Sequence, residues 1–208
     1  MRRFAVAAAL ATLAIAAAPA HAGTKTREHV KNVGNTAVAS WDYTQGNILT
    51  FVNVVATQND VSGTGGQAQD AFLSLAISQS DIVTGNVLIT GVAFVEGNNF
   101  TMTIDKDLNT ATLHAQDAIF QDDNSFTFFN VNIDLTFTGT GEAAVMKSHE
   151  NLREPGLKLE SHFEGTFRDA TASGSIFGKN ILFTPMPATS AQLQFNKFGS
   201  MAITTTTP

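Results

Sequence analysis

Apolar and polar residues alternate strictly in one stretch of the chain, residues 125–138 (SFTFFNVNIDLTFT). From Phe129 to Phe137 every second residue is apolar, and the residues between them are Asn, Asp or Thr. A period of two is typical of a strand with one packed face and one solvated face. The apolar phase slips between Phe128 and Phe129, which predicts a β-bulge at that point.

Similar short segments follow one another through most of the chain, separated by turns rich in Gly, Asn and Asp. The pattern predicts ten to twelve strands, no helix and an all-β fold. Residues 48–57 (ILTFVNVVAT) are apolar on both faces, as in a central strand that is covered on both sides. We therefore predict an antiparallel two-sheet β-sandwich, with a closed antiparallel β-barrel as the alternative. Gly91, in the middle of one predicted strand, indicates a bulge or a close approach of backbones.

The first residues have the features of a secretion signal. Arg2 and Arg3 precede an apolar run, and residues 19–22 (PAHA) place small residues at a cleavage site. This predicts a bacterial signal peptide over residues 1–22, cleaved near Ala22. The apolar run is shorter than the roughly 20 residues of a membrane-spanning helix. We expect a secreted or periplasmic protein that does not span the membrane after cleavage.

The rest of the chain is predicted to form one domain. Residues 23–35 are polar and are expected to be a lead-in or a first edge strand, residues 36–203 carry the other strands, and residues 204–208 are expected to fray. The chain has no cysteine, so no disulfide contributes to its stability. The domain is long enough to be stabilised by a hydrophobic core instead.

Charge narrows the range of partners. Removing Arg2 and Arg3 from the 12 basic residues, against 18 acidic ones, leaves the mature chain a net charge of −8. This composition predicts an acidic surface without a basic patch for phosphates, so we expect no nucleic-acid partner.

The best candidate for a chemical site is a group of charged residues on the predicted strand that follows the turn at residues 153–156. Glu160, His162 and Glu164 alternate along one face, about 7 Å apart. Counting back from the turn places His149 opposite residues 159–162. Histidine and carboxylate are ligands of zinc, and a carboxylate beside a histidine can transfer protons.

A second interpretation of the same residues is an ordinary solvated face. Alternating charges with Lys158 nearby are typical of exposed strands, and neither the order nor the spacing matches a named metal motif.

The run Asp105-x-Asp107-x-Asn109 resembles the start of a calcium loop but lacks its later Gly and Glu, which favours a hairpin turn.

Other catalytic motifs are missing from the sequence. It contains no cysteine, no Gly-x-Ser-x-Gly elbow and no glycine-rich phosphate loop. We therefore predict a non-enzymatic domain, without a cofactor, that binds a ligand, a polymer or another surface. One alternative is a lipocalin-like carrier whose Phe-rich faces line a cavity for an apolar molecule. The other is a metal-assisted hydrolase built on His149, Glu160, His162 and Glu164.

The C-terminal third carries one resemblance. Residues 161–174 (SHFEGTFRDATASG), followed by residues 183–187 (FTPMP), are similar to the C-terminal part of an uncharacterised group of secreted bacterial all-β proteins. The resemblance implies export and a β fold. It implies no activity.

Overall fold

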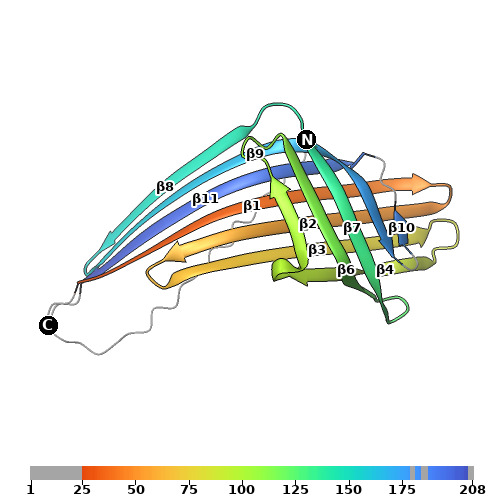
Figure 1. Ribbon diagram of the computed structural model, residues 1–208, viewed down its shortest axis with the longest axis horizontal. Coiled ribbons are helices and arrows are strands. Elements are labelled where there is room, and N and C mark those ends of the chain that lie inside the picture. The colour runs from red at the N-terminus through yellow and green to blue at the C-terminus, as the bar shows by residue number, and fades with distance from the viewer. Residues whose placement is uncertain (1–24, 179–180, 184–186, 206–208) are drawn as a thin grey trace.

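The computed structural model describes residues 25–178, 181–183 and 187–205 (Figure 1). The predicted signal peptide, residues 1–22, lies outside the described residues. The all-β prediction is confirmed, because strands make up nearly all of the described chain. The elements are β1 (Lys25–Gln45), β2 (Ile48–Gly63), β3 (Gly66–Asp81), β4 (Val87–Glu96), a 3-10 turn η1 (Gly97–Asn99), β5 (Phe100–Ile104), β6 (Thr110–Asp122), β7 (Thr127–Gly139), β8 (Ala144–Glu154), β9 (Leu157–Gly178), β10 (Ile181–Phe183) and β11 (Ser190–Thr205).

The strands pair into one continuous antiparallel sheet instead of two separate sheets. The pairing runs from β9 through β11, β1, β2, β3, β4 and β6 to β7, and β7 pairs again with β9. This return is possible because β9 is 22 residues long. Its first part pairs with β8 and β11, and its last part pairs with β7 and β10.

The hydrophobic core lies in one part of this sheet, which we call the body (residues 36–57, 72–139, 170–178 and 190–194). Alternate residues of its strands point to the same side and are buried, and Trp41, Phe120 and Phe137 are among the largest. The alternation predicted from Phe129 to Phe137 is confirmed, since all five apolar side chains are buried. Burial of each large apolar side chain contributes roughly 1.5–3 kcal/mol before the entropy cost of ordering it.

The remainder of the described sheet extends beyond the core as a single layer, which we call the wing. In Figure 1 strands β8, β9, β11 and β1 run together into it, away from β4, β6 and β7. Only two wing residues are buried, Gly34 and Gly165, and neither has a side chain. The wing therefore exposes both faces. It consists of residues 25–35, 58–63, 66–71, 144–154, 157–168 and 195–205.

The polar residues predicted as a lead-in belong to the wing. β1 begins at Lys25 and pairs with β11 from that residue, and with β2 from Val30. Likewise β11 continues to Thr205, two residues into the predicted tail. Polarity does not prevent this, because strands pair through backbone hydrogen bonds that any residue except proline can make.

The bulge predicted at Phe128 and Phe129 is wrong. Phe128 and Phe129 pair in unbroken register with Gln121 and Phe120 of β6. The apparent slip arises because Phe128 is 66% exposed and points away from the core, whereas Phe129 points into it. An exposed phenylalanine looks the same as a buried one in the sequence pattern.

The bulge lies in the partner strand. The register of β6 against β7 shifts between Ala115 and Ala118. Asp117, inside this shift, has a φ of 55° and its N–H donates to Asn132 Oδ1 at 2.8 Å. An unpaired residue with positive φ and a side-chain partner is typical of a β-bulge.

Two further predictions concern β2 and β4. Residues 48–57 are covered on one face only: Val52 and Val54 are buried, but Phe51 is 44% exposed. The prediction of cover on both sides is therefore wrong. The close approach predicted at Gly91 is confirmed, since a Cβ there would overlap the carbonyl oxygen of Gln121 in β6.

Within the described residues, no helix is long and apolar enough to cross a membrane.

Candidate functional site

The wing has two chemically different faces. Paired residues in neighbouring strands point to the same side of a sheet, so the register assigns each wing residue to a face. The side continuous with the core-facing residues of the body, called the inner face, is rich in Lys, Arg and His. The other side, called the outer face, carries Met146, Leu152, Leu159, Phe163 and Phe198.

Cationic residues are concentrated on the inner face. Of the nine Lys and Arg residues that the structure describes, eight lie there, contributed by four strands. Only three of the 18 acidic residues share this face: Asp60, Glu160 and Glu164. The prediction that the protein has no basic patch is therefore wrong for the wing. The eight residues are Lys25, Arg27, Lys31, Lys147, Arg153, Lys158, Arg168 and Lys197.

A hollow lies within this face, and a glycine creates it. One row of paired residues crosses four adjacent strands: His149 of β8, His162 of β9, Gly199 of β11 and Lys31 of β1. Gly199 has no side chain to fill its place in the row. A Cβ added there would meet no atom within 4 Å, so the space above it is open.

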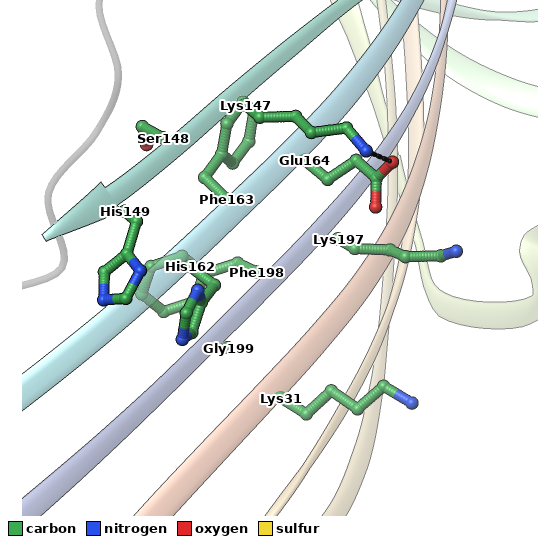
Figure 2. A pocket seen from close by; sticks show the side chains of 10 residues that line it. All are labelled: Lys31, Lys147, Ser148, His149, His162, Phe163, Glu164, Lys197, Phe198 and Gly199. Atoms are coloured by element: carbon green, nitrogen blue, oxygen red, sulfur yellow. Dashed lines mark ion pairs between the residues drawn. The ribbon is translucent and has the colours of Figure 1, made fainter.

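Lysines from three strands surround the hollow. Lys31, Lys147 and Lys197 line it from β1, β8 and β11, and Figure 2 shows their long side chains extending away from the two histidine rings. The hollow measures about 570 Å³, which is large enough for a sugar-sized group. The Lys197 ammonium also lies 5.1 Å from the ring centroid of Phe195, which helps to position it.

One carboxylate partly balances this positive charge. Glu164 Oε1 lies 2.9 Å from Lys147 Nζ (Figure 2). The hydrogen bond from Lys147 and the charges of Lys147 and Lys197 hold the pKa of Glu164 below its usual value. Glu164 is therefore ionised near neutral pH, and the three lysines still exceed the negative charge at the hollow.

The structure brings the two predicted histidines together. His149 pairs directly with His162, within the range predicted from the turn, and their ring centroids are 4.1 Å apart. The two predicted carboxylates have other partners: Glu164 pairs with Lys147, and Glu160 lies 2.7 Å from Lys158 Nζ. Among the described residues, no group of three or more His, Asp or Glu side chains is placed to hold a metal ion.

Glu160 shows the same electrostatics as Glu164. The hydrogen bond from Lys158, assisted by the charges of Lys158, His149 and Arg153, lowers the pKa of this carboxyl group. A carboxylate whose pKa is lowered in this way is a weak base near neutral pH. The arrangement is better suited to charge balance than to proton transfer.

The run from Asp105 to Asn109 is explained by its local structure. Asp105 accepts hydrogen bonds from the Asp107 N–H at 2.8 Å and from Asn109 Nδ2 at 3.0 Å, which closes the predicted turn. The carrier alternative places phenylalanines around a cavity, and two phenylalanines of the core contact each other. Phe120 and Phe129 are buried with ring centroids 5.2 Å apart.

The sequence pattern did not single out the lysines of the hollow. Lys31, Lys147 and Lys197 are far apart in the chain, and only strand register places them together. One local signal is present in the sequence, because Lys25, Arg27 and Lys31 fall on odd positions of the segment predicted to be a lead-in. No protein-family model matches the chain, and no curated protein shows a significant similarity to it.

Proposed function

We propose that the protein is a non-enzymatic exported binding module that holds an acidic polysaccharide on the inner face of the wing. The observation that carries the proposal is the open space above Gly199, surrounded by lysines from three strands. Lysine ammonium groups attract carboxylate and sulfate as point charges. An acidic sugar residue has the charge and the size for this hollow.

The extent of the inner face favours a polymer over a small anion. From Lys31 to Lys25 the strand β1 advances six residues, about 20 Å at about 3.3 Å per residue. Lys25 and Arg27 are exposed along this path. Several acidic groups of one chain can therefore contact the wing together, and linked contacts strengthen binding without any single tight site.

The charge of the rest of the molecule would orient the polymer. Fifteen of the 18 acidic residues lie outside the inner face, whereas among the described basic residues only Lys106 lies outside it. Arg168 is engaged with the carbonyl oxygen of Asp107 at 3.2 Å. A polyanion is repelled by the body and attracted by the wing, which confines binding to one surface.

The test measures binding of the mature chain to heparin, a sulfated polymer, and to polygalacturonate, a carboxylated one. We expect both to bind at low ionic strength and to be released by salt, because exposed charges are screened. Neutral dextran should not bind. If neither acidic polymer binds at about 50 mM salt, where exposed charges are only weakly screened, the proposal is overturned.

Variants locate the site. Lys31→Gln and Lys197→Gln should each weaken binding by roughly two- to fivefold, as expected for an exposed charge pair. Lys106→Gln is the matched control, since Lys106 is an exposed lysine on the turn between β5 and β6. Glu164→Gln should strengthen binding, because it removes a negative charge and frees Lys147. Equal losses in the control and in the wing variants would contradict the assignment.

A substitution at Gly199 separates shape from charge. Gly199→Leu should fill the hollow and reduce binding while the melting temperature stays unchanged, because the space is open. Binding of a single-stranded oligonucleotide as tight as that of heparin would mean that the face recognises polyanions in general, and it would contradict both the choice of polysaccharide and the prediction of no nucleic-acid partner.

A further inference from the structure

Strand β8 forms an open edge of the wing. It pairs only with β9 among the described strands, and all eleven of its residues are exposed. Its register with β9 is unbroken from Ala144 to Glu154. On its other side, β8 therefore presents a regular row of backbone N–H and C=O groups that no described strand uses. Such an edge is a template for pairing with another strand.

Among the features that protect edge strands, β8 has charged side chains but no proline and no bulge. The lysine in its middle, Lys147, is turned along the inner face toward Glu164. On the outer face Met146 and Leu152 are 53% and 47% exposed, so pairing at this edge would bury apolar surface.

We infer that two copies of the chain pair antiparallel through β8, about a two-fold axis at His149. In this register Met146 of each copy lies opposite Leu152 of the other, which makes two apolar pairs. Lys147 lies opposite Asn151, His149 lies opposite itself, and no two Asp or Glu residues and no two Lys or Arg residues face each other. All eleven residues of β8 have a partner. An edge that matches itself is what a closed two-fold dimer requires.

Neighbouring registers are less favourable. A shift of the axis to Glu150 would place Glu150 opposite itself and Lys147 opposite Arg153, and like charges directly opposite are destabilising. A shift to Ser148 would place Met146 opposite Glu150. The other open edge of the wing, residues 66–71 of β3, is shorter and includes Asp70. Pairing of β8 with that edge would produce open chains instead of dimers.

The first experiment measures the mass of the mature chain by light scattering and sedimentation over a range of concentrations. We expect a dimer that dissociates on dilution. Met146→Glu with Leu152→Glu puts Glu opposite Glu twice, which should raise the dissociation constant about tenfold or more. Met146→Lys with Leu152→Glu puts Lys opposite Glu and should restore the dimer. Both pairs of substitutions are at exposed positions, and circular dichroism checks that each variant is folded.

The second experiment uses the absence of cysteine from the natural chain. Residues on a two-fold axis of an antiparallel pair have Cα atoms about 4.5–5.5 Å apart, within the range of a disulfide. His149→Cys should therefore form a covalent dimer under mild oxidation. Asn151→Cys is the matched control: its side chain is exposed on the same strand face but lies opposite Lys147, so it should remain monomeric on a denaturing gel.

Three results would overturn the inference: a wild-type monomer at all concentrations, a dimer unaffected by Met146→Glu with Leu152→Glu, or equal crosslinking of the two cysteine variants. Growth to ever larger assemblies would instead indicate pairing between β8 and β3, and would also overturn it. The Met146 and Leu152 variants keep this test separate from polysaccharide binding, because both residues lie on the outer face; His149 lines the hollow, so the cysteine variants are used for crosslinking only.

Discussion

The body and the wing follow the same alternation but use it differently. In the body, alternation separates buried residues such as Phe137 from solvated ones, and the core stabilises the strands. In the wing, it separates a basic face from an apolar face, and both are exposed. The wing strands are continuations of body strands, so the body supplies the order that a single layer does not obtain from a core of its own.

This difference separates stability from binding. A substitution in the body should mainly change the free energy of unfolding, because its side chains are close-packed. A substitution on the wing should mainly change which molecules the surface binds, because the wing side chains remain partly exposed to solvent in the folded protein. The following predictions test this division, beginning with the largest effect.

The core phenylalanines should be far more costly to remove than those of the wing. Phe137→Ala is expected to lower the free energy of unfolding by about 3–5 kcal/mol, because it leaves a cavity among fully buried neighbours. Phe198→Ala, at a side chain that is 39% exposed, should cost less than about 1 kcal/mol. Urea unfolding of the two variants gives the comparison, and similar losses would contradict the division.

Two glycines provide a second comparison. Gly91→Ala should destabilise the protein by about 1–3 kcal/mol, because the added methyl group overlaps the backbone of Gln121 and forces β4 and β6 apart. Gly199→Ala on the wing should leave the melting temperature unchanged, since its Cβ has free space. A neutral Gly91→Ala variant would show that the two strands can separate without cost.

Asp122 is a buried polar residue of the body, and its substitution tests how much hydrogen bonds contribute to the stability of the body. This buried carboxylate accepts hydrogen bonds from the Asn124 N–H at 3.0 Å and from the Ser125 hydroxyl at 2.6 Å. Asp122→Ala leaves these donors without their partner and should cost about 1–3 kcal/mol in urea unfolding at pH 7. Ser125→Ala removes one of the hydrogen bonds and should cost less.

Asp122 should also make the free energy of unfolding depend on pH. Burial acts to raise the pKa of Asp122, but the hydrogen bonds from Ser125, Asn124 and Thr90 outweigh it and lower the pKa from its usual value of 3.8. A lowered pKa in the folded state stabilises the fold above the usual value, and this contribution is lost as the pH falls through the lowered pKa. The stability difference between the wild type and Asp122→Asn should therefore shrink below about pH 4. A constant difference from pH 7 to pH 2 would contradict this cause.

The smallest effect on stability is expected at the rim of the hollow. Lys147 and Glu164 are both substantially exposed, and such ion pairs contribute little to folding. Lys147→Gln should leave the urea midpoint unchanged while it alters heparin affinity. A clear loss of stability without a change in binding would mean that the wing lysines serve the fold.

The sequence was informative where a structure depends on neighbours along the chain. It predicted the buried alternation from Phe129 to Phe137, a bulge or close approach at Gly91, and the placement of His149 opposite residues 159–162, since a hairpin turn sets that register. It was wrong about Phe128, because the apolar pattern does not distinguish a buried side chain from an exposed one.

What the sequence alone determined is the alternation of each strand and its apolar, basic or acidic positions. Only the tertiary structure decided which strands pair, where the core ends and the wing begins, and that Lys31, Lys147 and Lys197 surround the gap left by Gly199. The physical reason is that alternation is a local property of the backbone. Register between segments more than a hundred residues apart is set by the packing of the whole sheet.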